Sequence, residues 1–96
     1  MRIELLDEAG QDLVEAARFY EQQTAGLGPY FLDSLFSDID SLQLYAGIHA
    51  VHYGYHRLLS RRFPYAVYYQ VDGERVRVWA VLDCRQDVKA IRRRLT

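Results

Sequence analysis

The chain has 96 residues, of which 50% are hydrophobic and 26% charged, with a net charge of −1. This length and balance predict one globular domain, residues 1–96, with a single core. The single cysteine excludes an intramolecular disulfide and fits a reducing compartment. No apolar run is long enough to span a bilayer, and acidic residues stand where a secretory signal would be apolar. We therefore expect a cytoplasmic protein without membrane contact.

The charges are unevenly distributed along the sequence. Residues 1–50 hold nine acidic side chains and two arginines, whereas residues 51–96 hold ten basic side chains and four acidic ones. A basic C-terminal half suits an acidic partner, either a protein or a nucleic acid. The alternative is a set of solvated charges with no common partner.

The chain begins with a predicted strand and helix. Arg2–Leu6 alternate apolar and polar residues, as a short strand does. Asp7 is expected to cap a helix that runs to about Gln23, because its carboxylate can accept from the free amides of the first turn. Apolar residues recur at helical spacing in this segment, at Ala9, Leu13, Ala16, Ala17 and Tyr20.

A second helix is predicted after a short connection. Gly26 is expected to end the first helix, and Gly28-Pro29 to open the second with proline in the first helical position. The second helix is expected to run to about Tyr45. Its apolar stripe is predicted to be Phe31 or Leu32, Leu35, Ile39 and Leu42. The short connection predicts an antiparallel helical hairpin.

The segment from Ala46 to Tyr55 has no clear pattern. Two glycines bracket IHAVHY, which could be a loop or an irregular strand. Tyr55–Ser60 are then predicted to form a strand that leads into Arg61.

Arg61–Arg85 predict two antiparallel strands joined by a tight turn at Asp72-Gly73. The first strand is apolar almost throughout and is expected to lie centrally in the sheet. On the second strand, strict alternation puts two sets of side chains on opposite faces: Val76, Val78, Ala80 and Leu82 on one, and Arg75, Arg77, Trp79 and Val81 on the other.

Asp87 is expected to cap a final short helix, DVKAIRRRL. The element order is therefore β-α-α-β-β-β-α. It predicts an α+β fold with an N-terminal strand, an antiparallel helical hairpin packed on a mainly antiparallel sheet, and a short C-terminal helix. Two helices on one face of the sheet make this a two-layer domain.

Three histidines, His49, His52 and His56, are spaced as metal ligands could be on a helix. The surrounding glycines and aromatic residues do not favour a helix, so we expect no metal and no cofactor. His56 stands next to Arg57 and could act as an acid or base. Cys84 has no neighbouring base and is expected to be a structural thiol.

Four arginines could converge if their strands adjoin. They are Arg57, Arg61, Arg62 and Arg85. Convergent guanidinium groups bind phosphates or carboxylates, whereas separate surface arginines form only weak ion pairs. Arg92-Arg93-Arg94 could contact phosphate or could stabilise the dipole of the last helix. The eight tyrosines could stack on nucleic-acid bases, although core packing explains most of them.

Nearly the whole chain resembles the RelE/ParE superfamily of toxins from type II toxin–antitoxin modules, in particular the plasmid stabilisation proteins. The matching segments are AGQDLVEAARFYE, GLGPYFLDSL, RLLSRRFPYAVYYQV and VRVWAVLDCRQD. The resemblance implies a toxin that is neutralised by a cognate antitoxin, encoded next to it. Such antitoxins lay an extended or helical segment, usually acidic, over the toxin, in a heterotetramer or larger complex.

The superfamily has two known modes of action, and the resemblance implies one of them here. Members that resemble RelE cut mRNA on the ribosome without a metal; members that resemble ParE inhibit DNA gyrase by binding. In the nuclease mode the candidate catalytic residues are Arg57, Arg62, Arg85 and His56. For binding of the target or the antitoxin the candidates are Arg61, Arg75, Arg77, Trp79, Arg92 and Arg93.

Departures from the family pattern favour the gyrase mode. No tyrosine follows Tyr69, so the C-terminal tyrosine of the nuclease type is missing, and Lys89 is the only lysine. The frequent His-x-Arg-Arg-x-Pro is replaced by a sequence that begins at Cys84 and lacks the histidine and the proline. We therefore expect a toxin that binds DNA gyrase. The alternatives are an mRNA endonuclease and a decayed member that binds antitoxin without being toxic.

Overall fold

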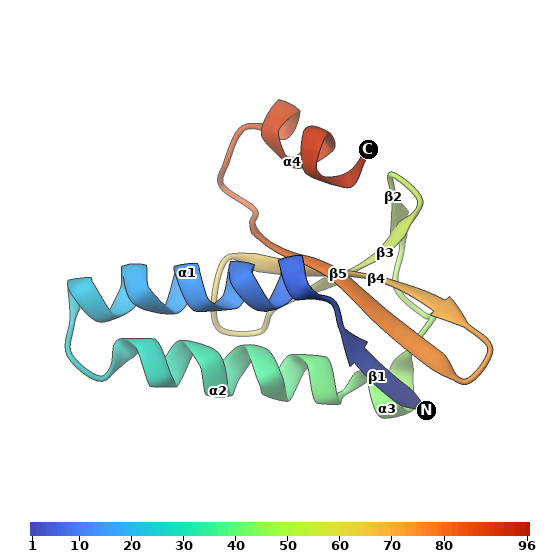
Figure 1. Cartoon of the computed structure of the whole chain (residues 1–96), viewed down its shortest axis with the longest axis horizontal. Helices are drawn as coiled ribbons and strands as arrows, with labels where there is room; N and C mark the ends of the chain where they lie inside the picture. Colours follow the sequence, from blue (N-terminus) through green and yellow to red (C-terminus); the bar gives the residue numbers. More distant parts are fainter.

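The computed structural model describes all 96 residues as a five-stranded sheet with helices on both faces (Figure 1). The strands are β1 (Arg2–Leu5), β2 (Val51–His52), β3 (Tyr55–Leu59), β4 (Tyr65–Asp72) and β5 (Arg75–Asp83). Their order in the sheet is β1-β5-β4-β3-β2, in which only β1 and β5 run parallel. The helices are α1 (Asp7–Gln23), α2 (Leu27–Asp40), α3 (Leu42–Tyr45) and α4 (Val88–Leu95). The predicted α+β fold and the central place of β4 are confirmed.

The main core lies between the sheet and the hairpin of α1 and α2. The predicted stripe of α1 is buried, except that Tyr20 is half-buried, and α2 buries Phe31 rather than Leu32. The two helices approach closely at Gly28, where a Cβ atom would lie 2.9 Å from the carbonyl oxygen of Ala17. Any larger residue at Gly28 would push the helices apart.

The expected start of α1 and start of α2 were wrong in detail. Leu6, not Asp7, occupies the N-cap of α1, and Asp7 lies in the first turn without a capping bond. α2 begins at Leu27 after Gly26, whose φ is 88°, so Pro29 is the third helical residue. The amides here are satisfied from α1: the Glu21 carboxylate accepts from Gly26 N–H at 3.0 Å and from Gly28 N–H at 2.9 Å. These bonds lower the pKa of Glu21.

The second helix also ends earlier than expected, at Asp40 rather than Tyr45. The Ser41 hydroxyl donates to the carbonyl oxygen of Asp38 at 2.6 Å and so competes with the backbone bonds that would continue the helix. A separate turn, α3, follows.

The segment from Ala46 to Tyr55, for which the sequence left a loop or an irregular strand open, contains both a loop and a strand. Residues 46–50 form the loop, and β2 then pairs with β3 through a two-residue turn at Tyr53-Gly54, whose φ angles are 56° and 85°. Two positive φ values are those of a type I′ hairpin turn, which matches the twist of the flanking strands.

The β4–β5 hairpin differs from the prediction in two respects. Because Asp72 pairs with Arg75, the turn is Gly73-Glu74 rather than Asp72-Gly73, and Gly73 alone has a positive φ. The strict alternation predicted for β5 fails because Trp79 is an extra residue: Tyr69 pairs with Val78, but Tyr68 pairs with Ala80. This β-bulge reverses the faces of all later residues in the strand.

The bulge distributes β5 between two cores. Before it, Val76 and Val78 face α1 and α2; after it, Val81 faces the helices and Ala80 and Leu82 face away. A second, smaller core lies on that far side, where α4 packs through Leu95 and Ile91 against four residues: Ala66, Tyr68, Ala80 and Leu82. The predicted two-layer arrangement is therefore incomplete, because α4 adds a partial third layer (Figure 1). Asp87 caps α4 as expected, by accepting from Lys89 N–H at 2.9 Å.

Candidate functional site

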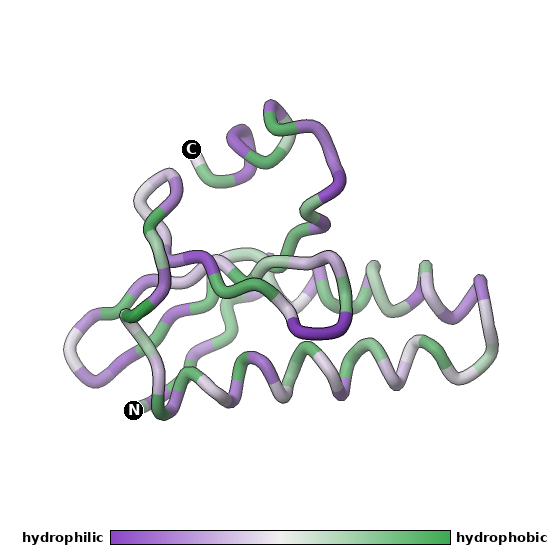
Figure 2. The backbone as a smooth tube through the Cα atoms, turned by 180° about the vertical axis from the view of Figure 1, so that it is seen from behind, coloured by the Kyte–Doolittle hydropathy of each residue, from purple (hydrophilic) through white to green (hydrophobic).

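The face of the sheet that carries α4 is divided into a covered half and an open half. α4 packs on the apolar half, near the start of β4 and the end of β5. Toward the β4–β5 turn, which is hydrophilic in Figure 2, the side chains become polar. We call this part the open face; it consists of Arg2, Glu4, Gln70, Asp72, Arg75, Arg77 and Trp79.

Trp79 stands at the border between the two halves, on the face of Arg77 and next to Ala80 of the covered half. The residue is 37% exposed, and its ring meets the Tyr55 ring edge-on at a centroid distance of 5.9 Å. An exposed tryptophan beside arginines is typical of protein-binding surfaces.

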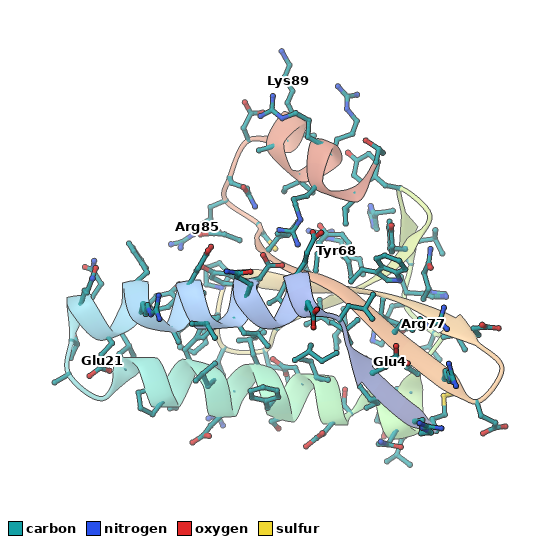
Figure 3. All side chains as sticks on the ribbon, viewed as in Figure 1. Glu4, Glu21, Tyr68, Arg77, Arg85 and Lys89 are labelled. Atoms are coloured by element: carbon teal, nitrogen blue, oxygen red, sulfur yellow. The ribbon has the colours of Figure 1, made fainter.

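Two rows of paired residues cross the rest of the open face. Arg75 lies between Arg2 on β1 and Asp72 on β4, and Arg77 lies between Glu4 and Gln70. Figure 3 shows Glu4 and Arg77 near one another at the hairpin end of the sheet, far from Arg85. The open face thus gathers three of the predicted binding residues, Arg75, Arg77 and Trp79.

Arg57 lies against Cys84 on the face of the sheet that carries α4. A terminal nitrogen of Arg57 lies 3.8 Å from the Cys84 sulfur, and Arg57 is the cross-strand neighbour of Tyr68. Burial raises the pKa of the Tyr68 hydroxyl, and the nearby Arg57 partly opposes this shift. Arg92 and Arg93 lie on the exposed surface of α4 above the covered half.

One aspartate of α1 joins three elements. The Asp12 carboxylate accepts from Arg94 of α4 at 2.7 and 2.8 Å, and from the Val81 N–H of β5 at 3.0 Å. β1 pairs only with Arg75–Val78, so this amide has no strand partner. Sequence reasoning missed Asp12, because a bond between residues 82 positions apart has no local signal.

Arg62 and Arg85 lie at the other end of the sheet, around an aromatic cluster. Arg62 donates to the Tyr30 hydroxyl at 3.3 Å, and Arg85 to the Tyr20 hydroxyl at 3.4 Å. Both tyrosine rings contact Phe63, at centroid distances of 5.7 and 5.0 Å. Arg61 is exposed in the same β3–β4 loop.

Arg85 is held in place by an acidic neighbour. Its side chain bonds both oxygens of Asp83, at 3.0 and 2.9 Å. These bonds raise the pKa of the guanidinium group and lower the pKa of the Asp83 carboxyl.

His56 points to the opposite face of the sheet from Arg57, since neighbouring residues of a strand alternate. Its ring stacks on Tyr69 at a centroid distance of 5.0 Å, and its Nδ1 lies 2.7 Å from the carbonyl oxygen of His49. The Tyr69 hydroxyl also accepts from Gly47 N–H at 3.0 Å and bonds His49 Nδ1. Desolvation, and then the nearby His56, lower the pKa of His49.

The arginines expected to converge therefore fall into separate groups. Arg61, Arg62 and Arg85 share one end of the sheet, whereas Arg57 lies beside Tyr68 on the face that carries α4. The three histidines do not form a cluster either, because His52 is exposed on β2. The structure contains no group of three His, Cys, Asp or Glu side chains that could share a metal ion.

Comparison with known proteins decides the family. Residues 3–88 match the family described as the ParE toxin of the type II toxin–antitoxin system parDE. The chain belongs to the ParE toxin family. The fold agrees: a solved structure entitled "Chromosomal ParDE TA system from P. aeruginosa" matches with a TM-score of 0.70 at 18% identity, over 84% of this chain and 92% of that chain.

No curated protein sequence matches this ParE-family chain. None of its helices has the length and apolar character that crossing a membrane would require. The family match over residues 3–88 confirms the toxin family expected from the sequence resemblance.

Proposed function

We propose that this protein is a toxin that acts by binding DNA gyrase and that a cognate antitoxin neutralises it in the cytoplasm. Membership of the ParE family supports the toxin role. The observation that carries the binding mode is the open face, where Arg75, Arg77 and Trp79 stand together next to a basic α4. Aromatic and arginine side chains of this kind make the strongest contacts in protein interfaces.

The arrangement of the candidate nuclease residues also supports binding rather than catalysis. RNA cleavage needs an acid and a base within hydrogen-bond reach of one phosphate. His56 lies on the helix side of the sheet in a stack with Tyr69, while Arg57 lies on the opposite face against Cys84. Arg62 and Arg85 lie at the far end and have no imidazole among their bonding partners.

The second candidate function is a ribosome-dependent mRNA endonuclease. One observation favours it: Arg62 and Arg85 flank the same aromatic cluster, and such a pair could stabilise a phosphate transition state. A decayed member that keeps only the antitoxin interface is the third candidate.

Pulse labelling of new DNA and new protein, minutes after the chain is induced without antitoxin, separates these candidates. We expect DNA synthesis to stop first. In vitro, the chain should inhibit supercoiling by purified gyrase, and Trp79→Ala should weaken this inhibition more than Val88→Ala, an exposed apolar residue on α4. Unaffected gyrase together with an early stop of protein synthesis would replace the proposal with the nuclease, and undisturbed growth would replace it with the decayed member.

A further inference from the structure

Arg77 is a half-buried arginine without an acceptor. It forms no salt bridge within the chain, and its Nε atom is buried with no hydrogen-bond partner. The other half-buried arginine, Arg57, contacts Cys84, and Arg94 on α4 is paired with Asp12. An arginine that is partly removed from water and unpaired is costly. The terminal nitrogens of Arg77 also form no hydrogen bond within the chain, but they are not buried, so an acceptor from outside the chain can reach them.

Arg77 lines a polar pocket of about 400 Å³. The pocket lies where β4 extends past the first residue of β3, and it is lined by Gly54, His56, Gln70, Val71, Asp72 and Arg77. The Gln70 side chain is fixed there, since its Nε2 donates to the carbonyl oxygen of Gly54 at 3.2 Å. The pocket therefore combines a cation with an oriented amide group.

We propose that this pocket receives one carboxylate side chain of the antitoxin. The inference rests on the proposed function, which supplies the antitoxin as partner. The terminal nitrogens of Arg77 would donate to the carboxylate, and partial exclusion of water strengthens such a charge-assisted bond. Trp79 and Tyr55, on the same side of the sheet, would contact the apolar part of the antitoxin segment.

The charges around the pocket favour a protein carboxylate over a nucleic-acid backbone. The open face holds three arginines, but Glu4 and Asp72 lie among them, and Asp72 itself lines the pocket. Every phosphate of a nucleic-acid backbone is negatively charged, so a backbone laid across the open face would be repelled by Glu4 and Asp72. A single acidic side chain can bind Arg77 and leave Asp72 facing a backbone N–H of the antitoxin segment.

The test compares two arginines on the same strand and the same face. Arg77→Gln should weaken the affinity for the purified antitoxin about tenfold or more, whereas Arg75→Gln, at an exposed position, should change it less than about threefold. Trp79, the only tryptophan of the chain, allows the binding to be followed by fluorescence. Thermal unfolding is the control that both variants must pass: each should unfold cooperatively, as the wild type does. Arg77→Glu should regain affinity with an antitoxin in which one acidic residue is changed to lysine.

A second measurement does not need the antitoxin. N-acetylglutamate should shift the Arg77 Nε–H and Gln70 side-chain NMR signals of the wild-type chain. Equal losses of antitoxin affinity in both variants, or no loss in Arg77→Gln, would overturn the inference and leave the proposed function intact. Oligonucleotide binding that disappears in Arg77→Gln, with antitoxin affinity unchanged, would assign the pocket to phosphate instead. An antitoxin that fails to bind the wild-type chain would overturn the proposed function and the inference together.

Discussion

At the residue scale, Tyr69 fastens a loop to the sheet. The ring is fully buried, yet its hydroxyl bonds both Gly47 and His49 in the loop that follows α3. Several apolar side chains in and around this loop are exposed, notably Leu44 and Ile48, so burial of the loop's own side chains contributes little to its position. The loop is therefore held mainly by polar contacts.

Replacing Tyr69 with phenylalanine should release this loop. The variant loses both hydroxyl bonds, at a cost of about 1–2 kcal/mol in the free energy of unfolding. Tyr65→Phe is the matched control: Tyr65 is buried on the same strand and face, but its hydroxyl makes no hydrogen bond within the chain. Urea denaturation measures both variants, and equal losses would show that the hydroxyl bonds of Tyr69 carry no stability.

His49, which bonds the Tyr69 hydroxyl, makes the free energy of unfolding depend on pH. The pKa of His49 is lower in the folded chain than its ordinary value of about 6.5, so the unfolded chain binds more protons below that pH. The contribution of His49 is therefore complete above about pH 6.5. It declines as the pH falls and is lost once the pH is below the folded pKa. Denaturation midpoints between about pH 7.5 and 5 should fall more steeply for the wild type than for His49→Gln; parallel curves would contradict this.

At the residue scale, the sequence predicts best the features that depend only on neighbouring residues in the chain. The buried stripe of α1 from Ala9 to Ala17 follows from spacing alone, because the period of a helix is a property of neighbouring residues. The partners of Tyr69 and Arg77 depend on strand pairing and on the path of the 46–50 loop, which no short pattern records. For that reason the sequence indicated arginines as binding residues but could not separate Arg77 from the others.

At the element scale, the junction at Asp12 determines how α4 is held. α4 buries only Leu95 fully and half-buries Ile91, so its apolar contact is small. The bonds from Asp12 to Arg94 and to the Val81 amide supply the remaining attachment. Beyond the end of β1, where β5 has no neighbouring strand on that side, Asp12 also supplies the hydrogen-bond acceptor for the Val81 N–H.

Asp12→Ala should loosen α4 without disrupting α1. We expect a loss of about 2 kcal/mol, because the carboxylate accepts from a charged group and from a half-buried amide. Amide hydrogen exchange at Val81 should accelerate. Glu15→Ala removes the same charge from the same helix at an exposed position without hydrogen bonds and should change stability by less than about 0.5 kcal/mol. Unchanged exchange at Val81 in Asp12→Ala would disprove the role of the junction.

The ends of elements were predicted less well than their interiors. Glu21 satisfies the start of α2 from within α1, and Ser41 interrupts α2 through its own hydroxyl. Both are side-chain hydrogen bonds that start or stop a helix, whereas the helix ends had been predicted from the positions of glycine and proline. By contrast, Asp87 acts on an amide two residues away, and this cap was predicted correctly.

At the scale of the whole molecule, the charges are sorted by layer. α1 and α2 hold eight acidic side chains and one arginine, whereas α4, on the other side of the sheet, holds four basic side chains and no acidic ones. Part of the uneven charge distribution along the sequence thus becomes a difference between the two helical layers of the fold. Such a field orients a charged partner as it approaches.

This layering predicts a salt-dependent association with the proposed acidic antitoxin. The rate constant for association should fall about tenfold between about 0.05 and 0.5 M salt, because screening shortens the reach of the α4 charges. The double variant Arg92→Gln/Arg93→Gln should flatten this dependence, and Arg18→Gln on α1 should not. An association rate constant that does not change with salt concentration would exclude electrostatic steering by the basic residues of α4. Stopped-flow mixing gives the measurement.

The bulge at Trp79 has a consequence for changes in chain length. Because Trp79 is the extra residue of the bulge, deleting it would leave Val78 and Ala80 in regular alternation, so that Val81 stays in the main core and Leu82 stays beside α4. Inserting one residue between Ala80 and Val81 acts on β5 as a frameshift acts on a message. Every residue after the insertion would change faces, so that Val81 would leave the main core and Asp83 would face the apolar side of α4. The deletion of Trp79 should therefore fold and the insertion should not, as circular dichroism can show. In this family member, the length of β5 after the bulge is as much a part of the core as any side chain.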